Sequence, residues 1–115
     1  MPSGFTIKDS GKREEYPSGM RRDLQDGKPR YDLVDLEMLT RWATHMGKGA
    51  EKYGSNNWQL ANSQEEADRF RSSAFRHLIQ WVRGDRDEDH ASAVFFNIAA
   101  YEYVMKKIDE QKLQT

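Results

Sequence analysis

The chain of 115 residues contains no cysteine, and its three prolines all lie before residue 30. Without cysteine, the chain can form neither disulfides nor thiolate metal sites. No apolar run approaches the roughly 20 residues that cross a bilayer, and the N-terminus lacks the apolar core of a signal peptide. These absences predict a cytoplasmic protein with no membrane partner.

An excess of either charge is also missing. The chain has 18 Lys and Arg against 19 Asp and Glu, which gives a formal net charge of −1. A duplex nucleic acid usually selects a clear basic excess, so we do not expect one as a partner, whereas a small anion needs only a local basic pocket. The hydrophobic fraction is only 37%. A core this limited is often completed by association, which predicts a homo-oligomer.

Residues 1–16 read as a flexible tail and residues 17–115 as one domain. Helical periodicity and capping signals predict helices over residues 35–52, 64–83 and 86–112. No segment shows a convincing strand pattern. The expected fold is all-α: a small bundle of about three main helices with an extended N-terminal segment over residues 17–32, completed by oligomerisation.

Each predicted helix carries its own apolar pattern. The expected stripe of the first helix consists of Leu36, Leu39, Ala43, Met46, Ala50 and Tyr53. That of the second consists of Ala67, Phe70, Ala74, Leu78 and Trp81. Residues 91–105 are apolar on nearly all sides. That pattern is typical of a central helix or of one at a subunit interface.

The densest candidate site surrounds the end of the first helix. Lys48 and Lys52 are spaced to project on one side, and Tyr53, Asn57 and Trp58 follow around a glycine. Cations for phosphates, an amide for a base edge and an aromatic ring for stacking are typical of nucleotide sites. The alternative is a helix end where lysines face the negative dipole terminus and tryptophan covers the core.

A second set of cations precedes the first helix. Lys28 and Arg30 flank Pro29, so their side chains project from a stiff backbone. A preorganised pair of cations loses less entropy when it binds an anion. In the alternative reading, Arg30 pairs with Asp32 on the surface.

Histidines and acids gather around the connection between the second and third helices. If these helices are antiparallel, His77 and His90 lie at similar depth, close to Asp85 and Asp89. Imidazoles and carboxylates together can hold a divalent ion, here Mg²⁺ or Mn²⁺, or activate water. The acids also have a simpler role, because a helix N-terminus favours negative charge.

Asn97 lies in the most apolar stretch of the chain, between Phe96 and Ile98. A buried amide without partners costs about 1–3 kcal/mol, so it needs a hydrogen bond. It belongs either to a polar stripe with His90 that meets a ligand, or to the helix itself, where it satisfies a neighbouring backbone group. His45 points away from the expected stripe and is predicted to lie on the surface.

These blocks together resemble a phage protein family, the N-terminal domain of dATP/dGTP diphosphohydrolases, a helical group related to MazG-like nucleotide pyrophosphohydrolases. The resemblance covers about residues 17–105. It runs through Ser18-Gly19, Arg22-Asp23, Gly27-Lys28-Pro29-Arg30-Tyr31-Asp32-Leu33, Lys48-Gly49-Ala50-Glu51-Lys52-Tyr53-Gly54, Asn57-Trp58, Arg76-His77-Leu78, Gly84-Asp85, Glu88-Asp89-His90 and Asn97.

The resemblance implies a phosphorylated purine nucleotide as ligand and a Mg²⁺-assisted release of phosphate or pyrophosphate. It assigns Asp89, His90 and His77 to catalysis, and Asp85 and Asp89 to the metal. It adds Tyr31, Arg76 and Asn97 to the ligand-binding residues named above. However, the paired mid-helix acids of MazG-type enzymes are missing, and metal-free phosphoryl chemistry lacks its main charge stabiliser.

Three functions therefore stay open. The chain is a nucleotide hydrolase, a non-catalytic binder that sequesters a nucleotide such as a cyclic signalling molecule of host immunity, or a structural oligomerisation module. The shortage of acids favours the binder over the hydrolase, and the number of polar blocks disfavours the structural module.

Overall fold

The computed structural model describes residues 7–114. It separates into two compact units, one ending at Val34 and the other beginning at Asp35. In the described part of the chain, no helix is both long and apolar enough to span a membrane.

The N-terminal unit contains a small hairpin. Strand β1 (Arg13–Glu15) pairs antiparallel with β2 (Arg21–Asp23). The turn between them is closed by Gly19, whose φ of +90° suits a residue without a side chain. The expectation of no strand was wrong here. Charged side chains hide the strand pattern, while the Pro17-Ser18-Gly19 turn brings the two segments together.

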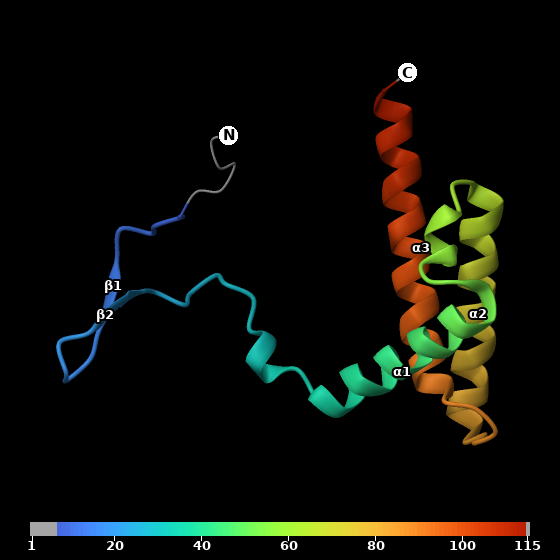
Figure 1. Ribbon diagram of the computed structural model, residues 1–115, viewed down its shortest axis with the longest axis horizontal. Coiled ribbons are helices and arrows are strands. Elements are labelled where there is room, and N and C mark those ends of the chain that lie inside the picture. Colours follow the sequence, from blue (N-terminus) through green and yellow to red (C-terminus); the bar gives the residue numbers. More distant parts are fainter. Residues whose placement is uncertain (1–6, 115) are drawn as a thin grey trace. The chain divides into compact units, whose positions relative to one another are not determined.

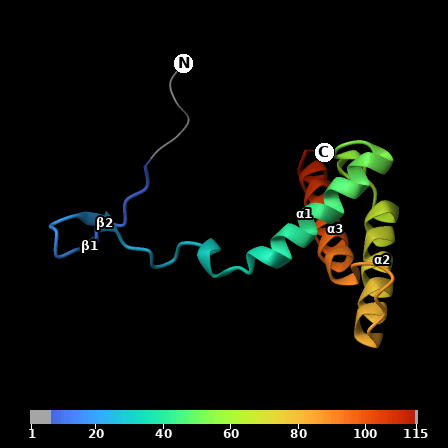
Figure 2. The same cartoon turned by 60° about the horizontal axis from the view of Figure 1, so that its bottom comes forward.

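The second unit is helical. It consists of α1 (Leu36–Tyr53), the short 3₁₀ turn η2 (Asn57–Leu60), α2 (Gln64–Arg83) and α3 (His90–Leu113). A further 3₁₀ turn, η1 (Tyr31–Leu33), precedes Asp35 in the first unit. Helices α2 and α3 run side by side in opposite directions, and α1 lies against α3 (Figures 1 and 2). The prediction of three main helices is confirmed.

Helix ends follow the capping signals in two cases of three. Asp35 caps α1 by accepting from the Glu37 amide, and Ser63 caps α2 by accepting from the Glu66 amide. The predicted start of the third helix at residue 86 was wrong. Asp89 is the cap, since its carboxylate accepts from both the amide and the hydroxyl of Ser92.

The core lies where α2 and α3 meet. Ala67 and Ala100 are fully buried, and such small side chains let the two helix backbones approach closely. Val104 packs with Ala61 and Ala67, surrounded by partly buried Phe70, Tyr101, Met105 and Ile108. This packing fixes the α2–α3 pair, on which the candidate site depends.

The expected apolar stripes were only partly right. On α1, Leu36 and Leu39 are exposed, and the helix instead turns Trp42 and His45 toward Phe95 and Phe96 of α3. On α2, Trp81 is exposed while His77 is buried, since an imidazole of α3 is available as its partner. Aromatic contacts and one buried histidine pair therefore decide which faces pack.

Candidate functional site

The second unit contains a groove of about 1090 Å³. It is lined by α1, by the turn that follows α1, by Phe70 of α2, and by the beginning of α3. The lining includes six of the site residues predicted from the sequence: Lys48, Lys52, Tyr53, Asn57, Trp58 and Asp89. The groove thus brings together two blocks that lie more than 30 residues apart in the sequence.

The end of α1 builds the cationic side of the groove. Lys48 and Lys52 are one helical turn apart, and the Lys52 Nζ lies 5.2 Å from the centre of the Tyr53 ring. Gly54 ends the helix with a φ of +95°, and Asn56 adopts a left-handed conformation at φ 60°. These two positions turn the chain so that Asn57 and Trp58 return to the groove.

Trp58 has a packing role as well as a place in the groove wall. Its ring meets Phe96 and Tyr103 edge-on, at centroid distances of 5.9 and 5.0 Å. Its indole Nε1 is buried and has no hydrogen-bond partner within the described residues. Most contacts of the Trp58 ring are therefore those of a residue that covers the core, as in the alternative interpretation. Its indole N–H remains an unsatisfied hydrogen-bond donor.

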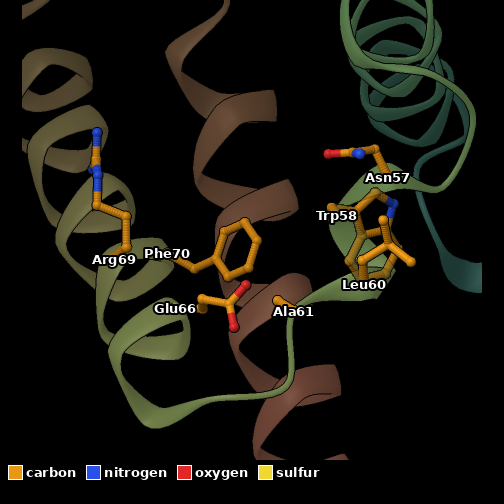
Figure 3. Close-up of a pocket in the computed structure, with 7 residues that line it drawn as sticks. All are labelled: Asn57, Trp58, Leu60, Ala61, Glu66, Arg69 and Phe70. Carbon is orange, nitrogen blue, oxygen red and sulfur yellow. The ribbon is translucent and has the colours of Figure 1, made fainter.

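A smaller cavity of about 250 Å³ shares part of this wall (Figure 3). Asn57, Trp58 and Phe70 line both hollows. In Figure 3, Phe70 points toward the middle of the cavity and Arg69 extends away along α2. The Glu66 carboxylate accepts from the Ser63 hydroxyl at 2.7 Å and from the Asn62 amide at 3.1 Å, and these bonds lower its pKa. Glu66 is therefore committed to capping.

An ion pair joins α1 to the start of α3 at the acidic side of the groove. Arg41 donates to both carboxylate oxygens of Asp89, at 2.9 and 2.7 Å. Together with the bonds from Ser92, this guanidinium holds the pKa of Asp89 far below its usual range. Asp89 is therefore a poor proton acceptor, and its contacts indicate a positioning role. Arg41 was not among the predicted site residues, because no motif distinguishes it from other surface arginines.

The two histidines predicted to lie together do so. The Nδ1 atoms of His77 and His90 are 2.9 Å apart, and His90 is only 2% exposed. The Nε2 of His90 lies 2.7 Å from Asp87 Oδ1. Because a carboxylate only accepts, His90 Nε2 is the donor in that bond. In neutral His90 the Nδ1 then accepts from His77, which yields a chain from His77 through His90 to Asp87.

Glu88 links this histidine pair to the groove. Ligand atoms of His77, Glu88 and His90 all lie within 4.8 Å of one another, and Glu88 also lines the groove. A second arrangement with the same spacing consists of Asp85, Asp87 and His90. Either set could hold a divalent ion. Neither Asp87 nor Glu88 was among the metal ligands predicted from the sequence, which were Asp85 and Asp89. The Asp-x-x-His spacing of Asp87 and His90 could have indicated from the sequence that these two side chains interact.

Burial also changes the protonation of His77. Desolvation is the main cause that lowers the pKa of His77, and Arg76 lowers it further, while Glu88 opposes the shift. Both effects favour the neutral imidazole, which is the form that binds a metal.

Other predicted site residues lie elsewhere. Lys28, Arg30 and Tyr31 belong to the N-terminal unit, where Arg30 donates to Asp32 at 2.9 and 2.7 Å, as in the alternative reading. Lys28 lies 3.6 Å from Asp23. Neither Arg76 nor Asn97 is among the residues that line the two hollows.

Asn97 allows a direct test of its two interpretations. Its side chain is 6% exposed, and its Nδ2 donates to the Ala93 carbonyl of the same helix at 2.8 Å. If the chain binds a nucleotide, as the resemblance implies, Asn97→Leu, which keeps the branched shape and the number of heavy atoms, should retain that binding within about twofold, because the amide serves its own helix. Calorimetric titration with dGTP checks this expectation. A loss of affinity in a variant with unchanged helical content would return Asn97 to the ligand site.

His45 makes stability depend on pH. It is half-buried against Phe96, and desolvation lowers its pKa, as does Lys48, while Asp89 and Glu88 oppose. Below about pH 6.5 the unfolded chain therefore binds protons more readily than the folded one, so stability is full above that pH and falls below it. His77 adds a shift in the same direction.

We accordingly expect His45→Gln to reduce the loss of melting temperature between pH 7.5 and pH 5.5. Thermal unfolding followed by circular dichroism measures the melting temperature at both pH values. The control is Gln111→Ala, a change at an exposed position. An equal loss in wild type and His45→Gln would contradict this origin of the pH dependence.

A family model described as "dATP/dGTP diphosphohydrolase, N-terminal" matches residues 18–113. No curated protein and no solved structure matches the chain.

Proposed function

The chain belongs to the dATP/dGTP diphosphohydrolase N-terminal family, and from this membership we propose that its groove binds a phosphorylated purine nucleotide such as dATP or dGTP and releases phosphate or pyrophosphate from it with the help of a divalent metal. The observation that carries the proposal is the convergence of Lys48, Lys52, Asn57, Trp58 and the Asp87–Asp89 segment on one groove.

The two sides of the groove suit different parts of a nucleotide. Lys48 and Lys52 offer ammonium groups to phosphates. Asn57 offers an amide to a base edge, and Phe70 and Trp58 offer apolar surface where the smaller cavity adjoins. A volume of about 1090 Å³ is ample for a nucleotide, since ligand pockets measure roughly 300–1,000 Å³. We propose that the base lies toward Asn57 and the phosphates toward Lys48 and Glu88.

Hydrolysis needs a metal-binding set, and the acids here fit Mg²⁺ poorly. Mg²⁺ prefers oxygen ligands in an octahedral arrangement. However, Asp85 is paired with Arg83, Asp87 with His90, and Asp89 with Arg41. Glu88 and the two imidazoles remain. In the proposed reaction His77 and His90 hold the ion or move a proton, and Asp89 acts only by fixing the start of α3 against α1.

The same observation favours a second candidate function. A groove with cations and aromatic rings, in which two of the four lining carboxylates, Asp87 and Asp89, are already paired, can bind a nucleotide without cleaving it. In this alternative the protein sequesters a nucleotide, including a cyclic signalling nucleotide of host immunity. Lys28, Arg30, Tyr31 and Arg76 stay predicted contributors to nucleotide binding in either case.

One incubation distinguishes the candidates. The full chain is mixed with dATP, dGTP and a panel of cyclic nucleotides in the presence of Mg²⁺, Mn²⁺ or Zn²⁺, and products are separated by chromatography. New product that disappears with Glu88→Gln supports the hydrolase. Bound nucleotide that is recovered unchanged after denaturation supports the binder. No affinity for any nucleotide would contradict both.

We also propose that the protein is a homo-oligomer. Phe75, Leu78, Ile79 and Val82 recur at helical spacing on one side of α2, and Phe75 and Val82 are 65% and 68% exposed. Apolar patches of this kind are uncommon on monomers beyond a few hundred Å². A second copy that offers the same helix would bury both patches across a two-fold axis.

Sedimentation tests this association. We expect wild type to sediment as a dimer or larger species and Phe75→Ser with Val82→Ser to sediment as a monomer of unchanged helical content. Replacing Lys106 and Lys112 with serine is the control, because these positions lie at the far end of α3. A monomeric wild type at all concentrations would refute the proposal.

A further inference from the structure

The geometry points to a metal site formed by the Nδ1 atoms of His77 and His90 and the carboxylate of Glu88, which selects an ion that prefers nitrogen ligands, such as Zn²⁺ or Co²⁺, over Mg²⁺. The site would replace the carboxylate magnesium site that the family resemblance implies. This inference rests on the proposed function in one respect: the nucleotide is expected to occupy the coordination position that the three protein ligands leave open.

The distance between the imidazoles is the first argument. Their Nδ1 atoms are 2.9 Å apart. Two nitrogens bound to one tetrahedral zinc ion at about 2.0–2.1 Å lie about 3.3 Å from each other, so the two Nδ1 atoms need to separate by only about 0.4 Å. A neutral His77 can shift its proton from Nδ1 to Nε2, which frees the Nδ1 lone pair without any change of charge.

Asp87 supplies the second argument. Its carboxylate accepts from His90 Nε2 at 2.7 Å and so keeps the proton on that nitrogen. The lone pair of His90 is thereby fixed on Nδ1, the atom that faces His77. A carboxylate that orients a ligating imidazole through its other nitrogen is the usual outer shell of a histidine metal site.

Glu88 completes the site and opens it to the groove. Its carboxylate lies within 4.8 Å of the ligand atoms of both histidines, and the residue lines the groove. Three protein ligands leave a fourth position for water or a phosphate oxygen, as in catalytic zinc sites. Two imidazoles and one carboxylate suit zinc and other transition ions, whereas Mg²⁺ prefers oxygen.

The alternative arrangement of Asp85, Asp87 and His90 is less suitable. It would require Asp85 to leave Arg83, which it contacts at 2.5 Å, and Asp87 to give up its bond to His90. The arrangement with Glu88 needs neither change. This contrast provides a matched pair of variants, Glu88→Gln and Asp85→Asn, which each remove one negative charge from the same loop.

Titration of the metal-free full chain with Co²⁺, followed by visible absorption and calorimetry, tests the site. We expect one equivalent to bind and excess Mg²⁺ not to displace it. His77→Gln and Glu88→Gln should lose this binding, and Asp87→Asn should weaken it about 10–100-fold. Asp85→Asn and His45→Gln should bind like wild type. Circular dichroism checks the fold of each variant. If the variant of a buried histidine unfolds, the variants at Glu88 and Asp87 still test the site, because these two residues are exposed.

Absence of saturable Co²⁺ binding would overturn the site, as would unchanged affinity in a folded Glu88→Gln variant. Loss of binding in Asp85→Asn, with Glu88→Gln unaffected, would also overturn it in favour of the other arrangement. Titration with dGTP in the absence of metal tests nucleotide binding separately. A failure of the metal site can therefore be distinguished from a failure of the proposed nucleotide site.

Discussion

Replacing Lys48 and Lys52 with alanine together should weaken the binding of dGTP by about 100-fold or more. Both lysines line the groove one helical turn apart. A charge-assisted hydrogen bond contributes about 1.5–3 kcal/mol, and two such losses reach this factor. Calorimetric titration of the full chain measures the affinity.

A matched variant makes this result specific. Lys106→Ala with Lys112→Ala removes the same charge from α3, outside the residues that line the groove. We expect that control to bind dGTP within about twofold of wild type. Equal losses in both double variants would mean that overall charge, rather than the groove, determines affinity. Unchanged affinity in the Lys48 and Lys52 variant would remove the cations from the site.

Val104→Asp should remove much of the protein's stability at 25 °C. Val104 is completely buried and packs in one core cluster with Ala61 and Ala67. A carboxylate there would be buried without an ion partner, which costs more than about 4 kcal/mol. A domain of this size is stabilised by only about 5–15 kcal/mol. Urea denaturation followed by circular dichroism measures the loss.

The neighbouring Glu102→Ala change is the control for position, because Glu102 is exposed on the same helix. It should alter stability by less than about 0.5 kcal/mol. Since the α2–α3 core also holds His77 opposite His90, Val104→Asp should lose Co²⁺ binding and helical structure together, at a lower urea concentration than wild type. A stable, helical Val104→Asp variant would contradict the packing described above.

The helices could be predicted from sequence because their signals are local. Ser63 and Glu66 cap α2 where their spacing predicts, and Gly84 ends the helix with a φ of +84°. The third helix began later than expected because several acids compete to cap it. Arg83 engages Asp85, which leaves Asp89 to bind Ser92. Competition between similar side chains is decided by tertiary contacts that the sequence does not display.

The candidate site was predictable where one segment carries several of its residues. The Lys48–Trp58 block lies on a single helix end and turn, so its residues share one groove. The pairing of His77 with His90 followed from an antiparallel helix connection. Arg41 was missed because its partner Asp89 lies 48 positions away. The face of α1 that packs on α3 was missed because Trp42 contacts Phe95 edge-on at 6.0 Å, a contact that periodicity does not reveal.

Hydrogen exchange of the full chain with and without dGTP tests the central claim most directly. If the groove binds the nucleotide, amides of residues 47–58 and 87–89 should exchange more slowly when it is present, and the Lys48→Ala, Lys52→Ala variant should lose this protection. Protection confined to other segments, or none at saturating dGTP, would contradict a nucleotide site in this groove.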